Sequence, residues 1–89
     1  MAELRNYMEF VVEEAVEREL NSGNASWCTG EKTKKDVMAI ILNRLPARYI
    51  VTDKGRIMTK IKETEVQFQA DVIREMMRAI ELVKKNPRT

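Results

Sequence analysis

The start of the chain alternates apolar and polar positions with the period of an amphipathic helix. The apolar residues that share one face are Leu4, Met8, Val11, Val12, Ala15 and Val16. Acidic residues fall on the other face, so the pattern predicts a helix over about residues 3–20. The densest group of turn formers, residues 21–24, ends this helix and begins a loop expected over residues 21–32.

A second helix is expected over about residues 33–45. Its centre, residues 37–42, is apolar on every side, so we expect it to be buried all round. Thr33 is the expected N-cap, and Asp36 follows three positions later, where a carboxylate can accept a backbone hydrogen bond. Pro46 ends the helix, because the residue before a proline is pushed out of helical geometry.

The segment after Pro46 is rich in β-branched and aromatic residues, which favour an extended conformation. We expect an extended stretch and turn over residues 47–58, with a short strand at residues 48–52 and a turn at residues 53–55. The sequence leaves open whether residues 56–58 pair back onto the strand as a hairpin.

The longest element is a helix expected over about residues 60–84. Its main apolar stripe contains Ile57, Ile61, Phe68, Val72, Met76, Ala79, Ile80 and Val83. Val66, Ile73 and Met77 add a second apolar edge, which favours a homodimer because one short helix cannot cover both edges. The predicted fold is therefore mainly α, one domain over residues 1–89 with three helices and a short extended segment or strand after the second.

Composition limits the class of protein. Apolar residues make up 44% of the chain and charged residues 34%, the balance of a folded, soluble domain. No stretch approaches the ~18 apolar residues of a membrane helix, and no signal-peptide pattern is expected at the N-terminus. Cys28 is the only cysteine, which excludes an internal disulfide and fits a reducing compartment, so we expect a cytoplasmic protein.

The sequence contains no histidine, which removes the usual general base near neutral pH and the commonest metal ligand. Without a histidine, Cys28 is a poor nucleophile because nothing accepts its proton. Catalysis by carboxylates alone stays formally open, but most glutamates fall on solvated helix faces. We therefore expect no enzymatic activity, no catalytic residue and no cofactor.

The charge is unevenly distributed along the chain. Residues 1–20 carry six acidic and two basic residues, a balance of −4. Residues 31–62 carry nine basic and three acidic residues, a balance of +6. This basic middle segment can attract anions, nucleotides included, although any single lysine can also serve only to keep the domain in solution.

Side chains that suit a ligand surround the end of the second helix. Asp36 and Asn43 lie two turns apart and so share a face, while Arg44 follows directly and Arg48 and Tyr49 come after the turn. We expect them to converge on one corner. Arginine offers a planar fork for phosphate or guanine, and Asp36 can accept hydrogen bonds from a guanine edge. A structural interpretation also stays open, in which Asp36 caps the helix, Asn43 ends it and Tyr49 fills the core.

These residues resemble a motif of the ComFB family of late-competence proteins. In that family a cysteine-containing segment precedes the pattern D-x-x-A-x-x-L-N-x-L-P and a residue pair ending in tyrosine. The matching positions here are Asp36, Ala39, Leu42, Asn43, Leu45, Pro46 and Tyr49. Residues 6–9 are also similar to the family's opening of asparagine, any residue, methionine and glutamate. The resemblance spans about residues 5–55, and the C-terminal helix matches only in kind.

The sequence departs from the family pattern in two ways. Many members carry three closely spaced cysteines, which in some bind zinc, whereas here only Cys28 is present and Gly30 and Thr33 occupy the later positions. With no histidine either, we predict no metal site and interpret Cys28 as a small buried residue. Ala47 stands where the family more often has a second proline, which is expected to loosen the turn slightly.

The resemblance implies a small homodimeric regulator, and several members of the family are receptors for cyclic di-GMP. The ligand-binding residues implied here are Lys35, Asp36, Asn43, Arg44, Arg48, Tyr49 and Thr52. Lys35 precedes the aspartate as it does in the ligand-binding branch of the family. The leading hypothesis is therefore a cyclic di-GMP receptor.

Two alternatives remain. The first is a dimeric protein–protein adaptor of competence or type IV pilus-type processes, which presents the acidic first helix or the strand at residues 48–52 to a partner. The second is DNA binding by the basic segment, which we rank lower because the second helix is too apolar to lie in a groove of DNA.

Overall fold

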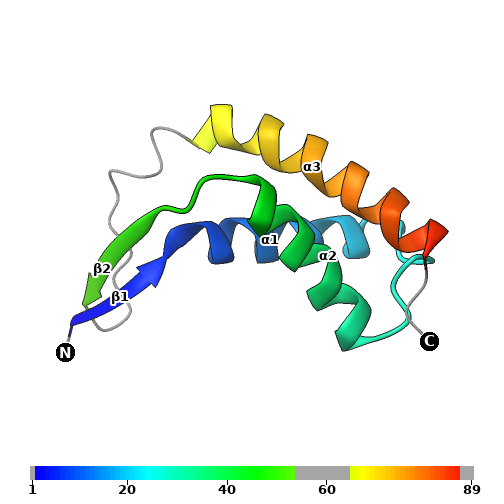
Figure 1. Ribbon diagram of the computed structural model, residues 1–89, viewed down its shortest axis with the longest axis horizontal. Coiled ribbons are helices and arrows are strands. Elements are labelled where there is room, and N and C mark those ends of the chain that lie inside the picture. Colours follow the sequence, from blue (N-terminus) through cyan, green and yellow to red (C-terminus); the bar gives the residue numbers. More distant parts are fainter. Residues whose placement is uncertain (1, 54–64, 87–89) are drawn as a thin grey trace.

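The computed structural model describes residues 2–53 and 65–86, with side chains at residues 3–51 and 69–86. In chain order the elements are strand β1 (Ala2–Asn6), helix α1 (Tyr7–Asn21), helix α2 (Glu31–Arg44), strand β2 (Tyr49–Asp53) and helix α3 (Glu65–Lys85) (Figure 1). The predicted mainly α fold is confirmed, with three helices and a two-stranded antiparallel sheet in this part of the chain.

The two strands form a ribbon at one end of the molecule (Figure 1). Leu4 pairs with Val51 and Asn6 with Tyr49 in an antiparallel register. The predicted strand after the proline is therefore confirmed, but its partner is the N-terminal segment. Residues 56–58, for which a hairpin was left open, lie outside the described residues.

The predicted start of the first helix at residue 3 is wrong, because residues 2–6 are extended and α1 begins at Tyr7. The side-chain oxygen of Asn6 caps α1 by accepting a hydrogen bond from the backbone amide of Met8 at 3.1 Å. Leu4 belongs to β1 and is 70% exposed, so it does not extend the buried face of α1. The competing interaction is the antiparallel pairing with β2, whose backbone hydrogen bonds take the place of those that a further helical turn would form.

Helix α2 begins at Glu31, two residues earlier than expected, and Gly30 is its N-cap without any side-chain hydrogen bond. The prediction that Thr33 caps the helix is wrong. Thr33 lies inside the helix, is buried, and its hydroxyl lies 2.7 Å from that of Thr29. The end of the helix is as predicted, because Leu45 has the extended angles φ −108° and ψ 145° directly before the proline.

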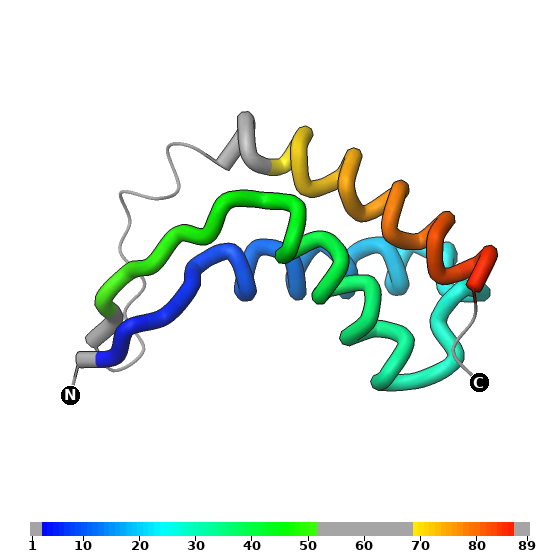
Figure 2. Tube along the Cα trace, viewed as in Figure 1, coloured from blue at the N-terminus to red at the C-terminus, as the bar shows by residue number. Residues whose placement is uncertain are grey.

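The core lies between the three helices, where α3 packs against α2 and also contacts α1 (Figure 2). The largest fully buried side chains come from each helix in turn: Met8, Val12, Val16, Val37, Ile41 and Val72. Burying an aliphatic side chain of this size contributes about 1.5–3 kcal/mol. Trp27 closes the core from the loop between α1 and α2, with its indole N–H donating to the carbonyl of Asn24 at 2.8 Å.

Two predictions about buried faces have different outcomes. Helix α2 is not buried all round, since Val37 and Ile41 are buried whereas Ala39 is exposed. The main stripe of the last helix is confirmed at Val72, Met76, Ala79, Ile80 and Val83, which are all buried. The positions predicted at residues 57, 61, 66 and 68 lie outside the described side chains.

None of the helices drawn for residues 2–53 and 65–86 combines the length and apolarity that crossing a bilayer requires.

Candidate functional site

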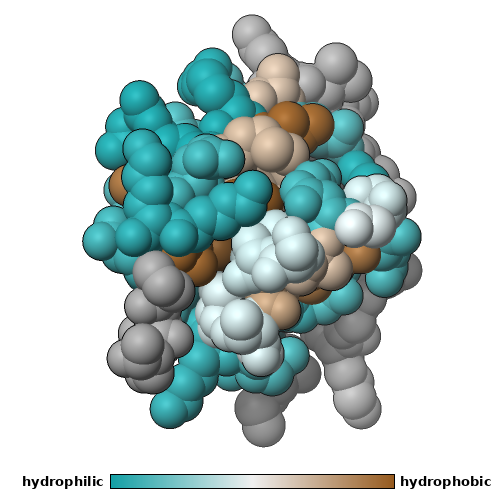
Figure 3. Space-filling model, turned by 90° about the vertical axis from the view of Figure 1, so that its right-hand side faces the viewer, coloured by the Kyte–Doolittle hydropathy of each residue, from teal (hydrophilic) through white to brown (hydrophobic). Residues whose placement is uncertain are grey.

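An open groove of about 470 Å³ runs between α2 and the end of α3. Its lining residues are Asp36, Ala39, Ile40, Asn43, Leu82, Val83 and Asn86. Figure 3 views the end of the molecule where α3 finishes, and there apolar side chains reach the surface among polar ones. The groove thus combines a carboxylate and two carboxamides with an aliphatic wall, the mixture that binding sites for organic ligands use.

Asp36 and Asn43 both line this groove, as their spacing of two helical turns predicts. Asp36 is half-buried and Asn43 is exposed. Asp36 does not cap α2, because that helix begins five residues before it, and Asn43 is the second-last residue of α2. Both polar side chains are therefore placed where a molecule in the groove would meet them.

Arg44 lies on a neighbouring face of α2 and is directed at α3. Its Nε donates to Oε1 of Glu75 at 2.7 Å, and its side chain remains 49% exposed while that of Glu75 is 9% exposed. This ion pair joins the end of α2 to the middle of α3. Arg44 is not among the residues that line the groove.

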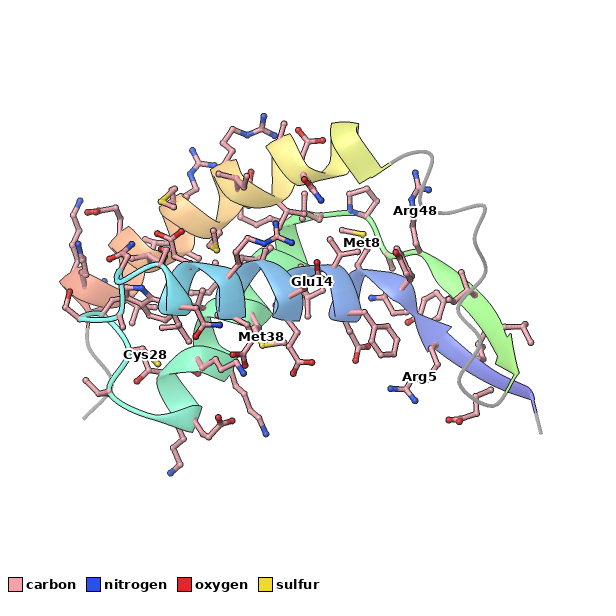
Figure 4. The ribbon with its side chains drawn as sticks, turned by 180° about the vertical axis from the view of Figure 1, so that it is seen from behind. Arg5, Met8, Glu14, Cys28, Met38 and Arg48 are labelled. Carbon is pink, nitrogen blue, oxygen red and sulfur yellow. The ribbon has the colours of Figure 1, made fainter. Side chains whose placement is uncertain are left out.

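Arg48 and Tyr49 lie beyond the proline turn, at the start of β2. The backbone of Arg48 is bound to the start of α1, because its carbonyl accepts from the amide of Tyr7 at 2.6 Å. Its side chain is exposed and extends away from α1 (Figure 4). Tyr49 is 66% exposed, so it does not fill the core.

The two remaining residues of the predicted site lie apart from the groove lining. Lys35 is exposed on α2. Thr52 belongs to β2, where it pairs with Glu3, and its side chain is not described. Of the three residues expected to meet at one corner, Asp36 lines the groove, whereas Arg44 and Arg48 are not among its lining residues. After the turn at the proline the chain continues into β2, which pairs with β1.

Sequence reasoning missed the contribution of α3 to this region. Leu82 and Asn86 lie four residues apart on one face and form the second wall of the groove. Glu75 occupies a position next to the apolar stripe between Val72 and Met76 and is only 7% exposed. A carboxylate next to an apolar stripe is the sequence feature that could have indicated this ion pair, because a buried charge needs a partner of opposite charge.

Cys28, expected to be a small buried residue, is half-buried and packs against the core, and its thiol donates to the carbonyl of Gly30 at 3.4 Å. Within the described ranges no three cysteine, aspartate or glutamate side chains gather to form a group that could hold a metal ion.

On the other side of α2, the ammonium of Lys34 donates to the carboxylate of Glu17 on α1. This hydrogen bond raises the pKa of Lys34 above its ordinary value of 10.5, because it stabilises the charged form. Nearby Glu31 and Glu13 act in the same direction through their charges. This ion pair therefore links α2 to the acidic face of α1.

A family model described as late competence development protein ComFB matches residues 5–87. The match therefore includes α3, which the sequence motif alone did not cover. Neither the comparison with curated proteins nor that with solved structures gives a match.

Proposed function

The chain belongs to the ComFB family, and from that premise we propose that it is a cytoplasmic, non-enzymatic regulatory protein that binds cyclic di-GMP as a homodimer. The observation that carries this proposal is the groove between α2 and α3. Its volume of about 470 Å³ falls within the range of roughly 300–1,000 Å³ found for small-molecule sites.

The chemistry of the groove suits a guanine base. Asp36 supplies a carboxylate that accepts hydrogen bonds from N–H groups, and Asn43 supplies a carboxamide that both donates and accepts. A guanine edge carries both kinds of group, with acceptors at O6 and N7 and a donor at the exocyclic amine. Ile40 and Leu82 provide the apolar surface against which the face of a base can pack.

The phosphates of the ligand require positive charge next to the groove. Arg44 follows Asn43 directly, and its half-exposed guanidinium lies on the adjoining face of α2. Arg48 and Tyr49 are exposed at the start of β2 and are the second set of contacts in this proposal, made by the same chain or by its partner. The basic balance of +6 over residues 31–62 supports attraction of a dianionic ligand.

The homodimer rests on a different observation. Ile73 and Met77 lie one turn apart on α3 and are 47% and 40% exposed. These side chains form the second apolar edge that the sequence predicts, and within the described residues no element covers it. A second copy of the chain would remove this edge from water, with a gain of roughly 25 cal/mol for each Å² of apolar surface buried.

Calorimetric titration of the purified protein with cyclic di-GMP tests the proposal. We expect a dissociation constant in the micromolar range or tighter, about −8 kcal/mol or better. Asp36→Asn and Arg48→Ala should each weaken binding by about tenfold, since each removes a charge-assisted hydrogen bond. Glu14→Gln and Arg18→Ala are the matched controls, because this exposed ion pair lies on α1 away from the groove. Absence of heat at tens of micromolar ligand would exclude the proposal.

A protein–protein adaptor is the second candidate, and the face of the β-ribbon favours it. Leu4, Tyr49 and Val51 share that face and are 70%, 66% and 57% exposed. A partner bound there should be lost with Leu4→Ser or Val51→Thr and retained with Asp36→Asn, whatever the concentration of cyclic di-GMP. Loss of the partner with Asp36→Asn alone would argue against the adaptor.

A further inference from the structure

Glu75 is a buried carboxylate with an arginine at each of its oxygens. Its Oε1 accepts from Nε of Arg44 at 2.7 Å, and its Oε2 lies 3.8 Å from Nε of Arg74. The two arginines come from different helices, Arg44 from the end of α2 and Arg74 from α3. Because a buried carboxylate needs such partners, Glu75 holds Arg44 by a hydrogen bond and Arg74 by a longer ion pair.

Both arginines face Glu75 through Nε, which matters for what they can still bind. A guanidinium carries five N–H groups, and the Nε–H is only one of them. The side chains of Arg44 and Arg74 are 49% and 68% exposed, so both remain accessible to a molecule in solution. One Nη of Arg74 lies 3.1 Å from a carboxylate oxygen of Asp71, with which it forms an ion pair. The outer edge of a guanidinium is the edge that binds phosphate oxygens in a bidentate manner.

A third arginine adds to the charge of this region. Arg78 is exposed and lies four residues after Arg74, so the two occupy the same face of α3. Three arginines against Glu75 and Asp71 leave a balance of +1 around the buried carboxylate. The region is therefore suited to an anion that approaches from the solvent.

We propose that Glu75 is a positioning residue that holds Arg44 and Arg74 as a pair for binding phosphate groups of an organic phosphate. In its application to cyclic di-GMP the inference rests on the proposed function. It adds Arg74 and Glu75 of α3 to the site. Arg74 binds phosphate together with Arg44, next to the groove that takes the base, and Glu75 holds the two arginines in place.

The alternative role for Glu75 is purely structural, fastening α2 to α3. The two roles differ in what happens to the folded protein when the carboxylate is neutralised. Glu75→Gln makes the surface more positive, so a simple effect of charge strengthens anion binding. Loss of positioning has the opposite sign and weakens anion binding, because the two arginines no longer hold a fixed separation.

The experiment follows the arginine Nε–H signals by NMR while inorganic pyrophosphate is added at low ionic strength, with cyclic di-GMP titrated separately by calorimetry. We expect saturable shifts of the Arg44 and Arg74 signals in the unaltered protein. Pyrophosphate should bind about tenfold more weakly to both Glu75→Gln and Arg74→Gln. Arg18→Gln is the control, since it removes one exposed arginine of α1 and should leave the affinity unchanged. Arg74 is exposed, so Arg74→Gln still tests whether Arg74 binds the phosphate groups if Glu75→Gln does not fold.

The outcomes separate this inference from the proposed function. If pyrophosphate binds at the two arginines but cyclic di-GMP does not bind, the arginine pair is supported and the proposed function is excluded. If cyclic di-GMP binds equally to the unaltered protein, Glu75→Gln and Arg74→Gln, the role of the arginine pair is excluded and the proposed function stands. Tighter pyrophosphate binding by Glu75→Gln, or no shift at Arg44 and Arg74, also excludes the role of the arginine pair.

Discussion

The side-chain oxygen of Asn6 accepts a hydrogen bond at 2.9 Å from the backbone amide of Arg48, which lies 42 positions later in the sequence. The same oxygen accepts the amide of Met8 at 3.1 Å and so caps α1. In return, the carbonyl of Arg48 accepts the amide of Tyr7 at 2.6 Å. One asparagine therefore ends β1, starts α1 and fixes the segment that carries the Arg48 side chain.

Replacement of Asn6 should be costly for this reason. We expect Asn6→Ala to lower the free energy of unfolding by about 1–3 kcal/mol, because it removes an N-cap and a second hydrogen bond. Asn6→Asp keeps an acceptor at the same place and should retain most of the stability. Urea unfolding followed by fluorescence measures both, since Trp27 is the only tryptophan and is 5% exposed. Equal midpoints for Asn6→Ala and the unaltered protein would contradict the assigned role.

The unequal burial of α2 gives a second prediction. Ile41 is fully buried, so Ile41→Ala should cost about 2–5 kcal/mol through lost transfer energy and the cavity left behind. Leu42 is only half-buried, and Leu42→Ala should cost clearly less. Urea unfolding of the two variants compares the positions directly. Similar losses at both positions would instead support the helix buried all round that the apolar run predicts.

The pair of Lys34 and Glu17 predicts a dependence of stability on pH. The pKa of Lys34 is raised in the folded protein above 10.5, chiefly by its hydrogen bond to Glu17. Its contribution to stability is therefore complete below pH 10.5 and is lost as the pH rises through the pKa of the folded state. As the pH rises above 10.5, the unaltered protein should lose stability more steeply than Lys34→Gln. Lys35→Gln is the matched control, and it should follow the unaltered protein.

The sequence predicted those features that depend on local periodicity. The three helices follow from apolar residues spaced three and four apart, and the end of α2 follows from the clash that Pro46 imposes on Leu45. Asp36 and Asn43 share the groove for the same local reason, because seven residues make two turns.

Features set by pairing between distant segments were not predictable in this way. Residues 2–6 alternate charged and apolar positions too briefly to signal a strand, and β1 exists because it pairs with β2 more than 40 residues later. The position of Arg48 next to β1 is a consequence of that pairing. The partnership of Arg44 with Glu75 likewise depends on how α3 packs on α2, which no spacing within either helix specifies.

The exposed edge of α3 provides the test of the homodimer. Ile73 and Met77 are large apolar side chains one turn apart, and a second copy that covers them must exclude water from both. Ile73→Glu or Met77→Glu should leave the fold intact, because both positions are at least 40% exposed in a single chain. Each should weaken association at least about tenfold, since burying an unpaired carboxylate costs several kcal/mol.

Sedimentation equilibrium measures this association. The unaltered protein should have twice the chain mass of 10.4 kDa at micromolar concentration, and the two glutamate variants should approach 10.4 kDa. Val51→Glu is the comparison, because it places the same charge on the exposed face of the β-ribbon. If only Val51→Glu dissociates the dimer, the two copies meet through the ribbon and the second edge of α3 serves another contact. If the unaltered protein already sediments at 10.4 kDa, any ligand is bound by one chain, and Arg48 cannot reach the groove from a partner.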